Sequence, residues 1–418
     1  MPIGYLVPVL LVACCTTASL SPARRPPRLG RLSFRMSVLV NEQPFALLLV
    51  LGAVTAWALA EGDLGSTGGR VGLALAVLTA FGLLVVARRG LLAVPALDRA
   101  LVDGLRTRPG RVTTRGLPWT RILLAPFAVR RRDVERLADL LYGADEHGGG
   151  GGGGEVGGGG SEEVGNRDSR GREHRLDVYR PRSRPADGPT LVYFHGGGYV
   201  SGRKELEARA MLSHLASQGW VCVSANYGLR PTTNFPGHLV DAKRVLAWVQ
   251  ARGAAYGADP HRVLVAGSSA GAHLASLAAL TPGDPRFQPG FEDSDTSVAG
   301  VVCLYGYFGE YYGSGRDRGV ESAPGDYLRS DAPPFLVVHG DQDTLVAVEG
   351  ARRFVADLRE VSAGPVVYAE LPGAQHGFDL FHSVRFDAVV TAVEEFAGRV
   401  VATRDRAPEA SVERREES

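Results

Sequence analysis

The sequence predicts an α/β protein whose central sheet is mostly parallel and carries helices on both faces. Strand-like apolar runs alternate with helix-like segments over the second half of the 418 residues, and polar residues directly follow several of the runs. The first ninety residues are organised differently and are much more apolar. The predicted strands are 176–179, 191–195, 221–225, 263–267, 300–305, 335–339 and 366–371, and the predicted helices are 205–218, 237–253, 270–280, 348–361 and 383–401.

Residues 1–90 contain three apolar stretches, which run from Ile3 to Leu20, Phe45 to Ala60 and Val71 to Ala87. The second and third carry no charge, and each would rise about 25 Å as a helix, at the short end of what crosses a membrane. The alternative is a buried helical hairpin in a soluble domain. Nothing nearby supplies the apolar partner surface that two uniformly apolar helices would need. We therefore expect a membrane anchor of two or three helices.

The charges that flank these stretches predict an orientation. Five arginines within residues 24–35 precede the second stretch, an arginine pair at 88–89 follows the third, and Glu61 and Asp63 lie between them. The positive-inside rule places both basic flanks, and the rest of the chain, in the cytoplasm. The first stretch could instead be a signal peptide or lipoprotein leader, although no basic residue precedes it, and Met36 could be the true start.

Three further segments surround the predicted sheet. Residues 91–147 form a connector, in which 117–141 has helix-like apolar spacing broken by three arginines; this stretch is either part of a helical cap or a solvated or membrane-surface face. Residues 148–172 are rich in glycine and predict a flexible linker or loop insertion. The sheet domain would then span 173–402, and 403–418 would be a disordered tail.

Composition argues against several classes of function. The 46 basic and 45 acidic side chains nearly cancel, so no long-range field favours nucleic acid, and no nucleic-acid-binding motif occurs. The four cysteines, Cys14, Cys15, Cys222 and Cys303, form no C-x-x-C pair and no zinc-like spacing. We therefore predict no metal site, no disulfide framework, no cofactor and no nucleic-acid partner. The oligomeric state is left open.

The segment Gly267-Ser268-Ser269-Ala270-Gly271 follows a strand-like run and precedes a helix-like stretch. A serine at the tip of such a turn needs small residues two positions before and after it, where neighbouring chain would otherwise collide. The turn would present the Ser269 hydroxyl at a helix N-terminus, where free N–H groups stabilise a negative oxygen. A chain with 54 glycines can produce G-x-S-x-G by chance, so this motif alone does not decide the function.

Three further features strengthen that interpretation. His195-Gly196-Gly197-Gly198 follows a strand-like run, and its glycines would let the main chain approach an acyl group and supply part of an oxyanion hole. Downstream, Asp343 and His376 each lie in a loop after a separate predicted strand. The order serine, aspartate, histidine along the chain is the one that the α/β-hydrolase fold requires.

These motifs resemble the hormone-sensitive-lipase family of α/β-hydrolases, which includes bacterial carboxylesterases and membrane-anchored arylacetamide deacetylases. The resemblance covers roughly residues 175–401. Three residues depart from the family pattern: Thr232 replaces a common Glu, Ser268 a common Asp, and Thr344 the usual Pro. The further segments that carry the resemblance are 226–231, 235–236, 241–249 and 257–263, and 287–307 is similar to that of actinobacterial esterases with hydrophobic N-termini.

The chemistry and the resemblance together imply the catalytic roles. Ser269 would attack the ester carbonyl, His376 would act as general base and then as acid, and Asp343 would fix the imidazole and stabilise its cation. The oxyanion would be held by backbone N–H groups of three residues, Gly197, Gly198 and Ala270.

Other residues of the same types are assigned structural roles. Ser268 cannot occupy the centre of the turn. Asp341 would be a cap or loop ligand, His339 ends a strand, and His382 begins the last helix. His195 would anchor the glycine loop by hydrogen bonds.

The predicted function is a membrane-anchored serine carboxylesterase or lipase that hydrolyses short- to medium-chain acyl esters through an acyl-enzyme, without a cofactor. The same groups can serve an amide or formamide hydrolase. A third interpretation is a hydrolase-like ligand-binding protein without turnover, against which the intact set of catalytic residues argues. The sequence does not name the acyl chain or the alcohol.

Overall fold

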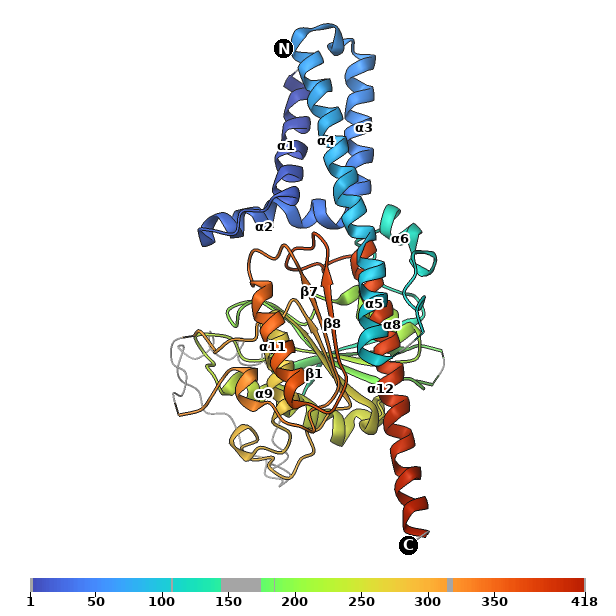
Figure 1. Cartoon of the computed structure of the whole chain (residues 1–418), viewed down its shortest axis with the longest axis vertical. Helices are drawn as coiled ribbons and strands as arrows, with labels where there is room; N and C mark the ends of the chain where they lie inside the picture. Colours follow the sequence, from blue (N-terminus) through green and yellow to red (C-terminus); the bar gives the residue numbers. More distant parts are fainter. Residues whose placement is uncertain (1–2, 107, 144–173, 184, 314–318, 417–418) are drawn as a thin grey trace, which may run out of the picture.

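In this computed structural model of the chain, the carboxyl ends of the parallel strands of a central sheet face a bundle of apolar helices (Figure 1). We call this side of the sheet its carboxyl edge, and the side formed by the amino ends of the same strands its amino edge. The structure describes residues 3–106, 108–143, 174–183, 185–313 and 319–416, with side chains described up to residue 404. The glycine-rich segment 148–172, which the sequence predicts to be a flexible linker, lies outside the described residues.

The described residues form an eight-stranded sheet with the order β1-β2-β4-β3-β5-β6-β7-β8. Strands β3 to β8 run parallel, whereas β1 pairs antiparallel with β2, and β2 pairs antiparallel with β4. This arrangement confirms the predicted α/β-hydrolase fold. The strands are β1 Val134–Leu141, β2 Arg175–Pro181, β3 Thr190–Phe194, β4 Val221–Ala225, β5 Val263–Ser268, β6 Gly300–Leu304, β7 Phe335–Gly340 and β8 Val366–Leu371.

Helices cover both faces of the sheet. Successive residues of β3 alternate between two cores: Leu191 and Tyr193 pack in one, and Val192 and Phe194 pack in the other. A strand buried on both faces has no polar face, which explains its continuous apolar sequence. Helices α5 Ala93–Leu105, α8 Arg209–Ser217 and α12 Val384–Glu416 cover the first face, and α9 Gly237–Arg252, α10 Ala270–Leu280 and α11 Val348–Val361 cover the second.

Four further helices precede α5: α1 Ile3–Leu20, α2 Pro27–Glu42, α3 Pro44–Ala60 and α4 Thr67–Leu91. Helices α1, α3 and α4 stand side by side, and α2 lies across their base (Figure 1). Within the described part of the chain, α1 and the continuous helix formed by α4 and α5 are long and apolar enough to cross a membrane. The pair α2 and α3, bent by 87°, would make a third span if counted as one.

Small residues bring α1 and α4 into close contact. A Cβ atom added at Gly72 would lie 2.8 Å from the Tyr5 ring, and one added at Gly82 would lie 2.8 Å from Thr16. Close packing at small residues is typical of helices that associate in a membrane. On the outside of the bundle, Trp57 is 72% exposed and Phe81 is 69% exposed, as expected for a lipid-facing surface.

Two segments differ from their predicted structure. The helix-like spacing within 117–141 yields only the short helix α6 Trp119–Leu124, and residues 134–141 form strand β1. The prediction of a helix there was wrong because pairing with β2, supported by an ion pair between Arg136 and Asp177, outweighs the local spacing.

The α12 backbone is helical to Glu416 and so extends into 403–418, the segment that the sequence predicts to be a disordered tail. The remaining short elements are 3₁₀ turns: η1 Asp63–Gly65, η2 Thr114–Gly116, η3 Gly253–Tyr256, η4 Pro260–Arg262, η5 Pro285–Phe287 and η6 Pro324–Tyr327.

Candidate active site

Ser269 lies at a sharp turn between β5 and α10. Its backbone has φ 55° and ψ −115°, a strained conformation for a residue with a side chain. A Cβ atom at Gly267 would lie 2.2 Å from the Gly271 carbonyl oxygen, and one at Gly271 would lie 2.0 Å from the Phe194 carbonyl oxygen. Only glycine fits at either position, which is the physical reason for the G-x-S-x-G spacing.

The structure brings Ser269, His376 and Asp343 together. Nε2 of His376 lies 3.0 Å from the Ser269 hydroxyl oxygen, and Nδ1 of the same ring lies 2.7 Å from Oδ2 of Asp343. The second carboxylate oxygen of Asp343 accepts hydrogen bonds from the backbone N–H groups of Leu345 and Val346, each at 2.8 Å. The three side chains thus form a continuous hydrogen-bonded chain at the carboxyl edge of the sheet.

The electrostatics of the pair favour an ionised aspartate beside a basic imidazole. Burial disfavours the charge of Asp343, but the imidazoles of His376 and His339 outweigh burial and lower the pKa of that carboxyl below its ordinary range. Burial likewise disfavours the imidazolium of His376, but the charge and hydrogen bond of Asp343 raise the pKa of His376 above its ordinary value. This arrangement suits a group that must accept a proton from a hydroxyl.

The glycine loop lies beside the turn. Gly197 has φ 112° and Gly198 has φ 62°, and a Cβ atom at Gly197 would lie 2.0 Å from the Ser201 carbonyl oxygen. The N–H of Gly196 is occupied, because it donates to Glu207 at 2.5 Å. Within the described residues, the backbone N–H groups of Gly197, Gly198 and Ala270 donate to no protein acceptor, so they are available to a bound anion.

The comparisons with known proteins agree on one family. A protein-family model described as BD-FAE matches residues 176–310. The probable carboxylic ester hydrolase LipM of Mycobacterium tuberculosis is 35% identical over 436 residues, which cover 96% of this chain and 94% of LipM. The chain belongs to the α/β-hydrolase esterases. It is accordingly a serine hydrolase of the carboxylesterase class.

Other relatives match a smaller share of this esterase. Esterase LipQ of the same bacterium is 40% identical over 56% of this chain and 61% of LipQ. A solved esterase of Thermogutta terrifontis with bound butyrate aligns at 25% identity and a TM-score of 0.48, over 55% of this chain and 89% of that chain. Because the LipM match covers 96% of this chain, it includes most of the N-terminal helices.

Sequence reasoning missed a buried acidic cluster beside Ser269 and His376. Tyr193 donates to the Ser268 hydroxyl at 2.7 Å, and Ser268 donates to Asp379 at 2.6 Å. The hydroxyl of Tyr305 also donates to Asp379, and the Tyr305 ring lies 4.5 Å from the His376 ring, centroid to centroid. Ser268 is therefore a structural neighbour of the nucleophile position, as predicted. Its departure from the family pattern was the one sequence signal that pointed here.

Glu207 extends this cluster to the glycine loop. Burial, and then the charge of Asp379, raises the pKa of Glu207 to about 7, and burial also raises the pKa of Asp379. Two carboxyl groups buried within reach of each other's charge resist ionising together. The cluster thus holds a proton near neutral pH directly below the Gly196 backbone.

The remaining residues considered in the sequence have structural partners. Asp341 accepts the N–H of Gly373 at 2.7 Å, and His382 pairs with Asp387 at 2.8 Å just before α12 begins. His195 donates to the Gly196 carbonyl at 2.7 Å and stacks on Tyr227. Burial lowers the pKa of His195 to about 4, so this ring is neutral at physiological pH and anchors the loop.

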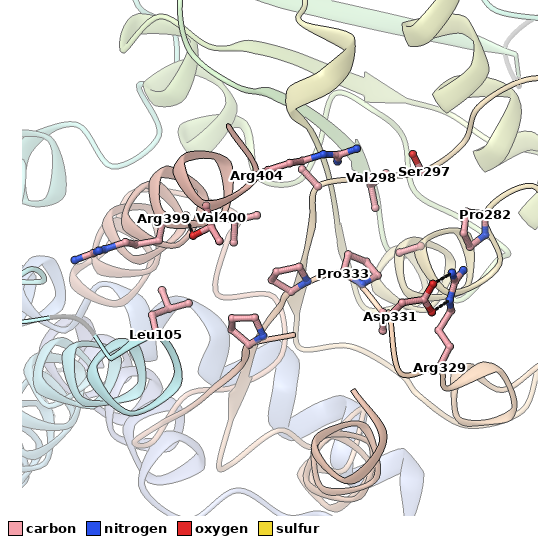
Figure 2. A pocket seen from close by; sticks show the side chains of 16 residues that line it. Leu105, Pro282, Ser297, Val298, Arg329, Asp331, Pro333, Arg399, Val400 and Arg404 are labelled. Atoms are coloured by element: carbon pink, nitrogen blue, oxygen red, sulfur yellow. Dashed lines mark hydrogen bonds and ion pairs between the residues drawn. The ribbon is translucent and has the colours of Figure 1, made fainter. Parts of the chain in front are cut away.

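A second site of interest is a cavity of about 500 Å³ at the opposite edge of the sheet. Figure 2 shows the ion pair of Arg329 and Asp331 at one end and Leu105 with Val400 at the other. None of its lining residues belongs to the triad or the glycine loop. Among the described residues, no group of three or more His, Cys, Asp or Glu side chains is placed to hold a metal ion.

Proposed function

We propose that this esterase hydrolyses short- to medium-chain acyl esters through an acyl-enzyme formed on Ser269. The observation that carries the proposal is the hydrogen-bonded chain from the Ser269 hydroxyl through His376 to Asp343, with free backbone N–H groups beside it. A nucleophile, a base within 3.0 Å and an orienting carboxylate are the parts that nucleophilic acyl transfer needs.

The first half of the reaction would proceed as follows. The Ser269 oxygen attacks the ester carbonyl carbon while its proton passes to Nε2 of His376, and the carbonyl oxygen becomes an oxyanion bound by the N–H groups of Gly197, Gly198 and Ala270. The tetrahedral intermediate then expels the alkoxide, which takes the proton from His376 and leaves as the alcohol. The acyl group remains bonded to the serine oxygen.

The second half repeats these steps with water. Water attacks the acyl carbonyl, His376 takes one proton from it, and the serine oxygen leaves with that proton as the acid is released. Asp343 stays ionised throughout, because its low pKa disfavours protonation and its charge stabilises the imidazolium that forms twice in each cycle. No cofactor enters either half.

We further propose that α1, α3 and α4 anchor the enzyme in a membrane, as the resemblance to membrane-anchored members of the hormone-sensitive-lipase family suggests, and that the charges flanking these helices place the sheet domain on the cytoplasmic side. The arginines of 24–35 lie in or just before α2, which crosses the base of the bundle, and the pair at 88–89 lies in the last turn of α4. Glu61 and Asp63 lie in the connection between α3 and α4, at the far end of the bundle (Figure 1). The positive-inside rule places the base in the cytoplasm. A C-terminal green fluorescent protein fusion should fluoresce, and a C-terminal alkaline phosphatase fusion should be inactive.

The catalytic proposal is tested on the full-length protein in detergent with p-nitrophenyl esters of graded acyl length and with aryl acetamides. We expect turnover that is highest for short or medium acyl chains, and labelling of the wild type by a fluorophosphonate probe. In Ser269→Ala both should vanish, with kcat lower by about 10⁵-fold. Ser268→Ala is the matched control and should keep the label. Turnover that persists in Ser269→Ala would contradict the proposal, and faster cleavage of acetamides would make the enzyme an amidase.

A further inference from the structure

Helix α2 lies between the bundle and the triad. It contacts the loop after β7 that carries Asp343, here called the acid loop, and the loop after β8 that carries His376, here called the histidine loop. The Gly30 carbonyl accepts the Thr344 hydroxyl at 3.0 Å, next to Asp343. The Phe34 ring meets the His376 ring edge-on at 6.2 Å between centroids. This helix, rather than the connector 91–147, therefore covers the candidate active site.

The far end of α2 is fixed to the chain that follows His376. Glu42 forms a buried ion pair with Arg385 at 3.1 Å and accepts the Ser383 hydroxyl at 2.6 Å. Arg385 also donates to the Pro372 carbonyl at 3.2 Å, on the other side of His376 in the sequence. The position of α2 and the position of the catalytic histidine loop are thus set by one buried network.

The two faces of α2 differ in character. Gly30, Phe34 and Asn41 recur at helical spacing on the face toward the sheet domain. On the opposite face, Leu32 is 52% exposed and Leu39 is 42% exposed, and the exposed arginines at 28, 31 and 35 flank this stripe. Exposed leucines flanked by arginines are the pattern of a helix that lies in the interface of an anionic membrane.

The direction of α2 fits that position. It meets α3 at 87° and lies across the base of the bundle, at the level where α1 ends and α3 begins (Figure 1). If α1, α3 and α4 span the membrane, α2 lies along its surface. The second element at this level is α6, which lies near the top of α5 (Figure 1); Leu124 and Phe127, at and just after its end, are strongly exposed.

Exposed apolar side chains also surround the triad. Val200 follows the glycine loop by two residues, and Leu345 lies two residues after Asp343. Leu380 and Tyr312 border the two loops, since a Cβ atom added at Gly377 would lie 3.5 Å from Leu380, and one added at Gly198 would lie 3.1 Å from the Tyr312 hydroxyl. All four side chains are more than a third exposed. An apolar rim around a reaction site favours a lipophilic substrate.

We infer that α2 is a membrane-surface helix that holds the catalytic edge of the sheet against the bilayer, so that the enzyme takes lipophilic esters directly from the lipid phase. The inference rests on the proposed esterase function and adds the source of its substrate. The leucines of α2 enter the interface, the arginines contact anionic headgroups, and the triad lies on the membrane-facing side of the sheet domain. A substrate that never leaves the bilayer can then reach Ser269.

The test uses the full-length protein reconstituted in vesicles of phosphatidylcholine and phosphatidylglycerol. The probe is a glycerol lipid with two long alkyl chains on ether bonds and a single octanoyl ester, which cannot leave the bilayer. We expect release of octanoate when enzyme and probe share vesicles, and little release when they occupy separate vesicles. Hydrolysis of p-nitrophenyl acetate by the same vesicles reports the water-soluble reaction.

Leu32→Glu places a charge on the outer face of α2, and Val361→Glu places one at the end of α11, far from the bundle (Figure 1). We expect Leu32→Glu to lower the ratio of probe hydrolysis to p-nitrophenyl acetate hydrolysis about five-fold or more, and Val361→Glu to preserve it. Equal probe hydrolysis in shared and separate vesicles, or an unchanged ratio in Leu32→Glu, would overturn the inference. A wild-type protein that does not hydrolyse p-nitrophenyl acetate would instead overturn the esterase function itself.

Discussion

The two edges of the sheet differ in what they gather. At the carboxyl edge, two tight glycine contacts and a strained serine hold a hydrogen-bonded chain of three side chains. At the amino edge, a cavity of about 500 Å³ is lined by prolines, apolar side chains and an arginine–aspartate pair. The cavity and the hydrogen-bonded side chains therefore lie at opposite edges of the sheet. Under the proposed function, the reaction is located by converging polar groups and not by empty space.

Within the triad, the substitution that most sharply tests the role of the carboxyl edge is Asp343→Asn. The substitution keeps the shape but removes the charge that orients and stabilises His376, so kcat should fall about 10³- to 10⁴-fold. The wild-type kcat/KM should fall as pH drops through the raised pKa of His376, since only the neutral imidazole accepts a proton. Without the carboxylate, that acid limb should move to lower pH. Both effects are measured with p-nitrophenyl esters.

Asp341→Asn is the matched control, because Asp341 lies in the same loop and its role is to accept a backbone N–H. An asparagine can still accept that bond, and turnover should stay within a few-fold of wild type. If the acid limb of Asp343→Asn coincides with that of the wild type, the assignment of Asp343 as the partner of His376 is wrong.

The next largest effect is expected at the turn itself. Gly271→Ala forces a methyl group to within 2.0 Å of the Phe194 carbonyl oxygen, so the backbone of β3 or α10 must shift. We expect destabilisation of about 3 kcal/mol or more, together with loss of turnover. Gly398→Ala, in α12, meets no atom within 4 Å and should be neutral or slightly stabilising. Thermal unfolding in detergent measures both, and equal midpoints would refute the steric argument.

The turn at Ser269 shows why part of the site could be predicted from the sequence. Gly267 and Gly271 are required by contacts between chain segments that flank Ser269, so their spacing is visible locally. Asp343 and His376 follow from their order after separate strands. The position of α2 over the site could not be predicted, because the contact of Phe34 with His376 joins opposite ends of the chain. No local pattern on α2 records that contact.

Two segments differ from their predicted secondary structure, each for its own reason. Leu137 and Leu140 in β1 are three residues apart, as on a helix, and a bulge between them in the pairing with β2 accommodates this spacing. In the second case the charged segment after residue 403 has no apolar face to predict a helix. It continues a helix that is already formed, and extending a helix costs less than starting one.

A smaller effect is expected from the acidic cluster. The pKa of Glu207 is about 7 in the folded protein because of burial and the charge of Asp379, whereas an exposed glutamate ionises near its ordinary value of about 4.3. Between these values the unfolded chain has lost a proton that the native state keeps, so the free energy of unfolding falls as pH rises through this window. Above the pKa of Glu207 in the folded protein, the free energy of unfolding falls no further on account of this group.

Glu207→Gln keeps an acceptor for the Gly196 N–H and removes the ionisation. Relative to wild type it should gain about 3 to 4 kcal/mol of stability above the window and nothing below it. Thermal unfolding across the pH range measures this difference, and Glu349→Gln, at an exposed position on α11, is the control. Parallel pH profiles for wild type and Glu207→Gln would show that Glu207 ionises normally in the fold.

The smallest effect is expected at the amino edge, where Ser297→Phe places a ring in the cavity of Figure 2. Ser297 precedes β6 at its amino end, whereas Ser269 follows β5 at its carboxyl end, so the two lie at opposite edges of the sheet. We expect kcat/KM on p-nitrophenyl acetate to stay within about two-fold of wild type, because the buried strands between the two edges keep one packed arrangement. A loss of ten-fold or more would show instead that the cavity is coupled to the triad, and the contrast between the two edges would no longer hold.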